Sequence, residues 1–503
     1  MRKLIFEKKF YLIAFTLFNL AILNSIYISK YFFLLGLAVF VLNIVPLVNF
    51  YYNYKKINYI PLFYFTHIFF FSCYTLALFI PELVNSIFKN EFFRTEYSNQ
   101  EHENLFIFAT EIYILGLFFF NLGDYIVSKS FNFKKKNYNF FDINDNVNEL
   151  LILGLLSYIF CSVFFFKDYF VILNKVYQIK YPLIYLSILS IQLYIILKKD
   201  LKIILKFILY LLILLIIYIE LLDGSVAKSF LYLIALYLIN FIVSKKINLK
   251  VMISIIFVSI FIHTFKYEYR NVIWGEKNLN STLKNYEFAK KQSNKKQNIL
   301  DRSNYFIKTY KDSLMNFDFK MGDPRFNKLS KGKSFLKRNF TRLTHSFQSL
   351  LIVTALSPDK ITYWEGSSYK ILLTKFVPRI FWANKPSDTL GNEFGLRYKV
   401  LSEKDNHTSW NMPVLNEFYV NFGLLGTIFG MLFLGAFFKT VTVLLNFDYK
   451  NYFFLISFIT LYPLFYLESH LSLTFGAVLQ TFIFLYIYIF IFKKILLIMK
   501  RSL

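Results

Sequence analysis

Long apolar blocks that carry few charges recur along the 503-residue chain, for example at 10–28, 62–80, 105–127 and 203–222. A helix of about 20 residues is long enough to cross the roughly 30 Å hydrocarbon core of a membrane. Only a helix satisfies its own backbone polar groups there, and these blocks lack the alternation of β-barrel strands. The blocks therefore predict an all-α, polytopic integral membrane protein.

The formal net charge of +26 does not indicate a nucleic-acid-binding protein, because no basic soluble domain or recognised binding motif accompanies it. Apolar residues make up 56% of the chain, which is too many for a soluble protein of this length to cover with polar surface. The basic residues instead gather at the ends of the apolar blocks, as the positive-inside rule predicts. Cys73 and Cys161 lie inside apolar blocks, where we expect them to pack as apolar side chains.

The apolar blocks divide the chain into about twelve predicted spans. Their ranges are 10–28, 31–49, 59–80, 104–127, 147–166, 182–198, 202–222, 226–243, 249–265, 413–438, 452–467 and 471–493. Lysine clusters that begin at Lys55, Lys134, Lys198 and Lys245 mark alternate connections as cytoplasmic. Both chain ends are also basic, so we expect both termini in the cytoplasm, which requires an even number of spans.

One connection, 266–412, is far longer than the others, and loops of this size commonly carry function. The sequence thus predicts a membrane bundle over 1–265, a large external loop over 266–412 and a second membrane bundle over 413–503. The loop contains 27 basic and 13 acidic residues, a balance that favours an anionic ligand. Long loops cross the membrane largely regardless of their charge, so the basic excess is compatible with an external position.

Two segments of this loop have an interfacial pattern. The apolar spacing of 335–356 predicts an amphipathic helix that lies at the membrane surface or caps the bundle, and Pro358 ends it. The segment 376–382 mixes apolar residues with one proline and one arginine, and it is too short to span a membrane. We expect 376–382 to be re-entrant or interfacial.

Motifs of soluble enzymes are absent from the sequence, which has no Walker A loop, no G-x-S-x-G, no H-E-x-x-H and no C-x-x-C. The long loop also lacks the Asp-x-Asp pair that many metal-dependent sugar transferases use to hold a divalent cation. Glu403 and Asp405 are the nearest substitute, and a solvated loop explains them better. We therefore expect a site without a metal and without a cofactor.

An ordered set of short motifs lies between Arg342 and Gly435. The set comprises Arg342-Leu343-Thr344-His345, Ser357-Pro358, Glu365-Gly366-Ser367-Ser368-Tyr369, Val377-Pro378-Arg379-Ile380-Phe381-Trp382-Ala383-Asn384-Lys385-Pro386, and Asn416-Glu417-Phe418-Tyr419-Val420-Asn421-Phe422-Gly423-Leu424-Leu425-Gly426. In these residues the chain resembles the bacterial oligosaccharide repeat-unit polymerases, the Wzy-type O-antigen and capsule polymerases. Outside them, the chain shares with that family only its many spans and one large external loop.

The resemblance implies glycosyl transfer between two lipid-linked substrates at the outer face of the bacterial cytoplasmic membrane. A polyprenyl-diphosphate-linked oligosaccharide would be the donor, and a second lipid-linked repeat unit would supply the acceptor hydroxyl. It also implies membrane lipids, a chain-length regulator and a flippase of the same pathway as partners, and no nucleic acid. Such a reaction needs cations for the departing diphosphate and a base for the hydroxyl.

Candidate residues for these roles lie in and beside the external loop. Arg379 and Arg342 suit a diphosphate because a guanidinium binds phosphate bidentately, and Lys385 and Arg270 could add charge. Glu417, at the start of the tenth predicted span, is the candidate base, with His345 and His407 as rivals. Trp382 and Tyr419 are candidates to stack on sugar rings. Structural roles remain open for each, such as headgroup anchoring for Arg379 and ion pairing for Glu417.

Two other functions remain open at this point. A lipid-linked oligosaccharide flippase would be expected to place its cations inside the membrane bundle, whereas the cations here gather in one external loop. A lipid-linked glycan ligase would use similar chemistry, and the sequence separates it poorly from a polymerase.

Overall fold

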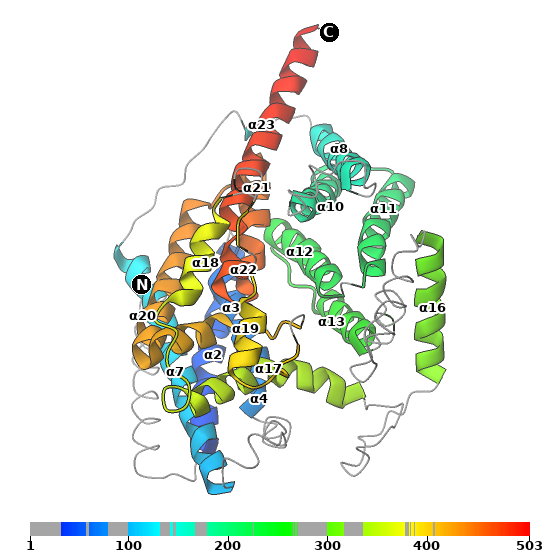
Figure 1. Ribbon diagram of the computed structural model, residues 1–503. Helices are drawn as coiled ribbons and strands as arrows, with labels where there is room; N and C mark the ends of the chain where they lie inside the picture. The colour runs from blue at the N-terminus through cyan, green and yellow to red at the C-terminus, as the bar shows by residue number, and fades with distance from the viewer. Residues whose placement is uncertain are drawn as a thin grey trace. The chain divides into compact units, whose positions relative to one another are not determined.

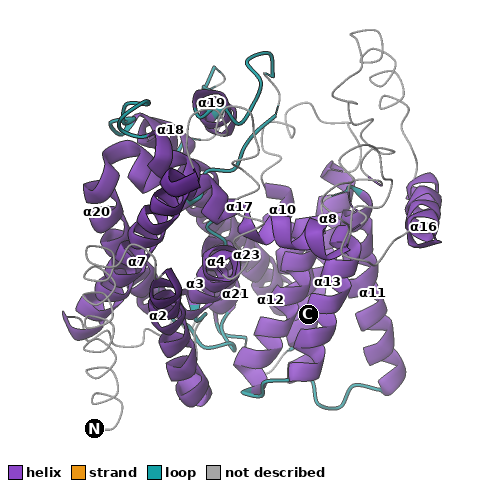
Figure 2. Cartoon of the chain, turned by 90° about the horizontal axis from the view of Figure 1, so that it is seen from below, coloured by secondary structure: helices purple, strands orange, loops and turns teal. Residues whose placement is uncertain are grey.

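The computed structural model describes residues 32–56, 60–78, 99–130, 141–143, 147–165, 179–224, 226–264, 266, 269, 299–315, 335–377, 382, 384–386, 388–405 and 408–502. Within these ranges all regular elements are helices, as Figure 2 shows, and the only β-type pairing is an isolated bridge between Asp142 and Asn451. The described part of the chain is therefore all-α, as the sequence predicted.

Seven helices are long and apolar enough to cross a membrane. They are Leu35–Asn53, Glu101–Ser130, Lys180–Leu197, Ile203–Leu222, Val226–Ser244, Val414–Leu444 and Leu471–Lys500. Shorter apolar helices at Leu62–Leu78, Asn148–Val163, Leu249–His263 and Tyr452–Phe465 coincide with four more of the predicted spans. The first predicted span, 10–28, lies outside the described residues. These helices confirm a polytopic membrane protein.

The chain forms two compact units, each assembled from separate stretches of sequence. Unit 1 consists of Met1–Asn144, Ser162–Pro182 and Leu343–Leu503, and unit 2 of Asp145–Cys161 and Leu183–Arg342. The division of the chain into 1–265, 266–412 and 413–503 stays a prediction.

Unit 1 contains the helices that form the candidate site and other helices packed with them; Figure 1 labels them. They are α2 (Phe32–Asn53), α3 (Leu62–Phe70), α4 (Leu76–Leu78), α7 (Asn99–Ser130), the part of α17 (Phe335–Leu356) from Leu343 on, α18 (Ser367–Lys375), α19 (Leu390–Arg397), α20 (Val414–Leu444), α21 (Tyr452–Leu461), α22 (Leu471–Phe475) and α23 (Val478–Ser502). A π-helical turn, Phe71–Thr75, joins α3 to α4, and 3₁₀ turns follow α2 and α21 at Tyr54–Lys56 and Tyr462–Phe465.

The helices α7 and α20 pack against each other along much of their length (Figure 1). Their backbones approach closely at two glycines. A Cβ atom added to Gly123 would lie 2.1 Å from the carbonyl oxygen of Leu432, and one added to Gly435 would lie 2.0 Å from that of Phe120. Small residues allow such close approach of membrane helices, which gain dispersion energy from it. This reciprocal contact fixes α20, the helix that carries Glu417, against α7.

The helix α20 is kinked at Phe422 and Gly423, where the backbone leaves helical geometry. Gly423 has φ of +59°, a left-handed conformation that glycine adopts at little cost. A Cβ atom at Gly426 would lie 2.0 Å from the carbonyl oxygen of Phe418 in the same helix. The glycine series in this segment therefore accommodates the kink, whereas Gly435 makes the contact with α7.

A buried polar cluster ties α2, α3 and α7 together within unit 1. The two ring nitrogens of His67 lie 3.2 Å from Asn43 Oδ1 and 3.0 Å from Asn121 Oδ1. Asn43 also donates to the hydroxyl of Thr75 at 2.8 Å. Because a buried polar group without a hydrogen bond is costly, these contacts hold the three helices in a defined register.

Unit 2 contains most of α8 (Asn148–Phe165) and α10 (Lys180–Leu197), with α11 (Ile203–Leu222), α12 (Val226–Ser244), α13 (Leu249–Thr264) and α16 (Ile299–Met315). Tyrosine hydroxyls attach α16, and Tyr269 just after α13, to helix ends. Tyr310 donates to the carbonyl of Ile262 at 2.6 Å, and Tyr269 donates to that of Leu222 at 2.8 Å. Arg302 adds an ion pair to Asp223 at 2.6 Å. These contacts satisfy carbonyls that helix ends leave without intrahelical partners.

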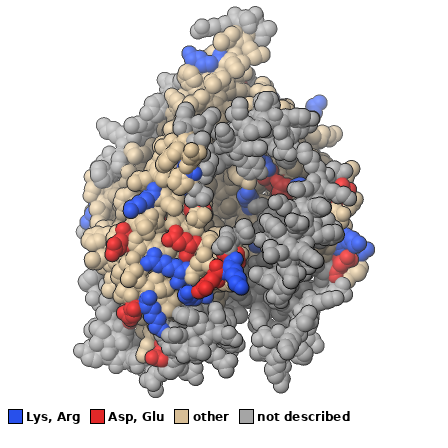
Figure 3. Space-filling view, viewed as in Figure 1, with Lys and Arg blue, Asp and Glu red and all other residues tan. Residues whose placement is uncertain are grey.

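The predicted amphipathic helix over 335–356 is α17, with the same bounds and with Pro358 two residues beyond its end. Its apolar residues Phe347, Leu350 and Leu351 are fully buried in unit 1. On the face drawn in Figure 3, described acidic and basic side chains gather over the region of α18 and α19. The interfacial segment 376–382 is described only at Phe376, Val377 and Trp382, all of them exposed.

Candidate functional site

Glu417 lies in the first turn of α20 and is completely buried. Its two carboxylate oxygens have different donors. The Ser368 hydroxyl of α18 donates to Oε1 at 2.6 Å, and the backbone N–H of Leu471, the first residue of α22, donates to Oε2 at 2.6 Å. Hydrogen bonds to a carboxylate offset the cost of burying its charge. Glu417 therefore joins three helices at one point.

The kink in α20 leaves backbone carbonyls without a donor from the same helix, and the loop before α18 supplies donors for them. Beyond a kink, carbonyls lose the donor four residues ahead in the helix. The backbone N–H groups of Trp364 and Glu365 donate to the carbonyls of Val420 at 3.0 Å and Asn421 at 3.2 Å. The N–H of Gly366 donates to Asn421 Oδ1 at 2.9 Å. This backbone pairing places Ser368, at the start of α18, within reach of Glu417.

Asn421 completes this first half of the site. Its side-chain amide donates to the Ser368 hydroxyl at 2.9 Å and to the carbonyl of Glu417 at 2.8 Å. The Ser368 hydroxyl thus accepts from Asn421 and donates to Glu417. A fully connected buried network of this kind holds each side chain in one position.

A second carboxylate, Asp388, lies in the short loop before α19. Its Oδ1 is 3.0 Å from His470 Nε2, and its Oδ2 accepts from the Ser472 hydroxyl at 2.6 Å and from Lys375 Nζ at 3.0 Å. Burial by itself raises the pKa of the Asp388 carboxyl, but the bonds from His470, Ser472 and Lys375 outweigh it and hold that pKa well below its usual range. Asp388 is therefore a carboxylate at neutral pH.

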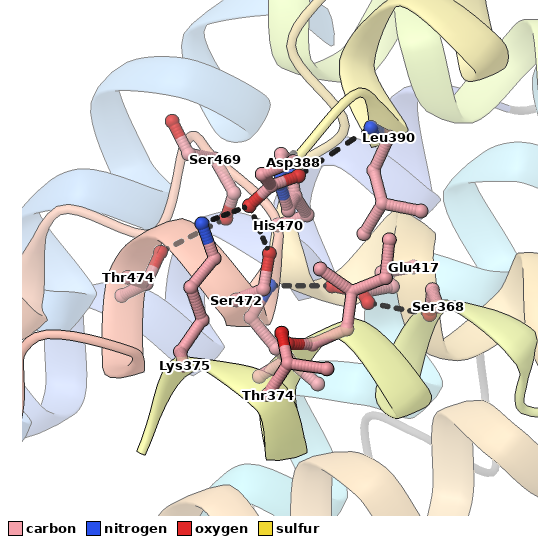
Figure 4. Close-up of polar contacts among 12 residues, drawn as sticks. Ser368, Thr374, Lys375, Asp388, Leu390, Glu417, Ser469, His470, Ser472 and Thr474 are labelled. Atoms are coloured by element: carbon pink, nitrogen blue, oxygen red, sulfur yellow. Dashed lines mark hydrogen bonds and ion pairs between the residues drawn. The ribbon is translucent and has the colours of Figure 1, made fainter. Parts of the chain in front are cut away.

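Both carboxylates meet the N-terminal turn of α22, as Figure 4 shows. His470 precedes that helix, and its carbonyl accepts from the N–H groups of Leu473 and Thr474 at 3.0 Å each. The His470 side chain contacts Asp388, and the next residue, Leu471, donates its N–H to Glu417. Two acids, a histidine and a lysine thus share one hydrogen-bonded cluster, which can bind an anion and transfer a proton.

The other predicted site residues that the structure describes have partners of their own. His345 packs against Trp410, with ring centroids 4.5 Å apart and the ring planes tilted by 31°. Tyr419 is buried and donates to the carbonyl of Ser357 at 3.3 Å. Lys385 is 8% exposed and donates to the carbonyl of Val377 at 2.8 Å, whereas Trp382 is exposed. The partners of Glu417 given above include none of these four residues.

Four predicted site residues have side chains outside the described part of the chain. Arg270, Arg379 and His407 lie outside the described residues, and Arg342 is described only as part of the backbone of α17. Their roles stay predictions.

Sequence reasoning did not select Lys375, Asp388, His470 or Ser472 as site residues. One signal could have found His470: together with Glu468 it lies in the three-residue connection between the predicted spans 452–467 and 471–493. An ionisable residue within an apolar region is by default a functional candidate. Lys375 and Asp388 carry no such signal, because charged residues are common in a long polar loop.

In the parts of the chain that the structure describes, no group of three or more His, Cys, Asp or Glu residues is arranged to hold a metal ion.

Comparison with protein-family models, with curated proteins and with solved structures gave no match to this chain.

Proposed function

We propose that this chain is a membrane glycosyltransferase that polymerises polyprenyl-diphosphate-linked oligosaccharide repeat units into a surface polysaccharide. The observation that carries the proposal is the cluster in which Glu417, Asp388, His470 and Lys375 meet at the start of α20 and α22. Glycosyl transfer needs a base for the acceptor hydroxyl and a cation for the leaving diphosphate, and this cluster contains both kinds of group.

Lys375 is the described cation best suited to the leaving group. Its side chain is 15% exposed and, among the described residues, forms one ion pair, to Asp388 at 3.0 Å. An ammonium has three donors, so two remain for diphosphate oxygens. Arg379 and Arg342 keep their predicted role as bidentate phosphate ligands.

The proposed location of the reaction is the outer face of a bacterial cytoplasmic membrane. With both termini in the cytoplasm, the predicted topology places the loop 266–412 and the connection 468–470 on the same, external side. All four side chains of the cluster come from these two connections or from the adjoining end of α20. Repeat units that have already been flipped across the membrane would meet the cluster there.

Deletion of the gene, followed by analysis of lipid-linked glycans, tests the proposal. A polymerase predicts that single lipid-linked repeat units accumulate on the outer face and that polymer is lost. Accumulation on the inner face would instead indicate a flippase, and intact polymer that is not attached to its final acceptor would indicate a ligase. Either result would overturn the proposal.

Substitution of Arg379 examines the predicted phosphate contact. Arg379→Ala should lower polymer synthesis by about a hundredfold, the usual loss when one donor to a developing anion is removed. Arg379→Lys should restore part of it, because a point charge cannot reproduce the planar guanidinium. Wild-type polymer from both variants would leave Arg379 as a headgroup anchor.

A further inference from the structure

We infer that His470 is the residue that takes the proton from the acceptor hydroxyl, with Asp388 orienting its ring and Glu417 positioning its backbone. The inference rests on the proposed function and assigns a different base from the one that the sequence suggested. It follows from which polar atoms of the cluster already form hydrogen bonds within the protein.

Both carboxylate oxygens of Glu417 already accept a short hydrogen bond from the protein. Ser368 and Leu471 each donate to a different carboxylate oxygen at 2.6 Å, and the side chain is fully buried. A general base must reach the proton that it removes within hydrogen-bond distance. Glu417 instead fixes the N–H of Leu471, the residue that follows His470, and so acts as a positioning residue.

His470 has the opposite arrangement. Its Nε2 lies 3.0 Å from Asp388 Oδ1, whereas no described residue forms a hydrogen bond with Nδ1. Because a carboxylate only accepts hydrogen bonds, Asp388 favours the tautomer with the proton on Nε2. That tautomer leaves a lone pair on Nδ1.

Asp388 also suits the protonated state that follows. A carboxylate held beside an imidazole stabilises the imidazolium formed during proton transfer. The bonds from Ser472 at 2.6 Å and Lys375 at 3.0 Å keep Asp388 oriented and ionised. The same Lys375 places a cation next to the base, where the leaving diphosphate would lie.

The step balances without a further reactant. The acceptor hydroxyl gives its proton to His470 Nδ1 while its oxygen bonds to the anomeric carbon of the donor glycan. The bond from that carbon to the diphosphate oxygen breaks, and the polyprenyl diphosphate leaves with the electron pair. His470 then returns its proton to the solvent or to the departing diphosphate.

The His470 side chain is only 2% exposed in the substrate-free protein. The exclusion of water strengthens its interaction with Asp388 and limits hydrolysis of the donor. The start of α22 must therefore move away from the residues packed against it before the acceptor hydroxyl can reach His470. The exposed residue nearest to His470 in the sequence is Leu473, one helical turn further on, which is 51% exposed.

Two glutamine variants separate the candidate bases. In His470→Gln the amide nitrogen reaches about as far as ring Nε2 and can still donate to Asp388, but it is not basic. In Glu417→Gln the amide can still accept from Leu471 and donate to the Ser368 hydroxyl. His263→Gln, the same chemical change in α13, is the matched control.

The assay uses purified protein in nanodiscs and radiolabelled lipid-linked repeat units extracted from the deletion strain. We expect His470→Gln to lower the initial rate at saturating substrate by about 10²–10⁴-fold, the usual contribution of a general base. Binding of the extracted units and the thermal midpoint should stay close to those of His263→Gln. Glu417→Gln should lose no more than about tenfold.

Asp388→Asn gives an independent test should His470→Gln fold poorly. The Asn amide can donate to ring Nε2, which moves the ring proton to Nδ1 and blocks the base. The corresponding change in serine proteases lowers kcat by about 10⁴-fold while the geometry stays intact. A near-normal rate in a folded His470→Gln or Asp388→Asn protein would overturn the inference, as would a large loss confined to Glu417→Gln. Failure of the proposed function looks different, because the unaltered protein would then show no transfer either.

Discussion

Glu417 and Leu471 lie 54 positions apart in the chain, and the backbone N–H of Leu471 donates to Oε2 of Glu417 at 2.6 Å. The contact anchors the start of α22 to the start of α20. Because His470 directly precedes Leu471, the same bond fixes where the histidine meets Asp388. A buried carboxylate that binds backbone is therefore the element that assembles the site.

Removal of the Ser368 hydroxyl should destabilise the protein, since it leaves one oxygen of a buried carboxylate without its donor. We expect Ser368→Ala to lower the free energy of unfolding by about 1–3 kcal/mol. Ser367, the neighbouring serine, is exposed, so Ser367→Ala is the matched control. Thermal unfolding of both variants in the same detergent measures the difference. Equal midpoints would mean that Ser368 does not support Glu417.

The contact between α7 and α20 should be sensitive to a single methyl group. In Gly435→Ala the new Cβ would lie 2.0 Å from the carbonyl oxygen of Phe120, and a backbone atom in a packed helix cannot move aside. We expect a destabilisation of about 1–3 kcal/mol, typical of overpacking. Gly36→Ala in α2, where no atom lies within 4 Å of the added Cβ, should have little effect. Similar unfolding midpoints for the two variants would contradict the close packing.

The stability that Asp388 contributes should depend on pH with a defined sign. The folded-state pKa of Asp388 lies below that of an unfolded aspartate, about 3.9. Its contribution is therefore fully present above that value and is lost as the pH falls through the folded-state pKa. The difference in unfolding midpoint between wild type and Asp388→Asn should stay constant from pH 7 to about pH 5 and narrow below about pH 4. A difference in unfolding midpoint that grows as the pH falls would contradict this prediction.

The predicted topology can be tested at two exposed lysines. Lys308 in α16 belongs to the loop predicted to be external, and Lys246, between α12 and α13, belongs to a connection predicted to be cytoplasmic. In a background without Cys73 and Cys161, a membrane-impermeant thiol reagent should label Lys308→Cys in intact cells. Lys246→Cys should react only after lysis. Labelling of both, or of Lys246→Cys alone, would refute the two-sided arrangement.

The sequence by itself determined the helical membrane architecture. Apolar runs of span length leave a chain no other way to satisfy its backbone in lipid, and this is a local property. The same holds for α17, whose bounds follow from the apolar periodicity of 335–356 and from Pro358 just after it. The motif segment that contains Glu417 also marked the end of α20 at which the buried polar cluster lies.

Only the tertiary structure decided what Glu417 contacts. Ser368 and Leu471 lie 49 and 54 positions from it, and Asp388 and His470 lie 82 positions apart. Such pairings depend on the direction in which the kink at Gly423 turns α20. They also depend on which loop donates hydrogen bonds to the carbonyls that the kink leaves without a helical partner. A sequence shows that a carboxylate is present at a span end, but whether its oxygens are free or occupied depends on contacts between distant segments. For that reason the base suggested by sequence, Glu417, and the base suggested by geometry, His470, are different residues.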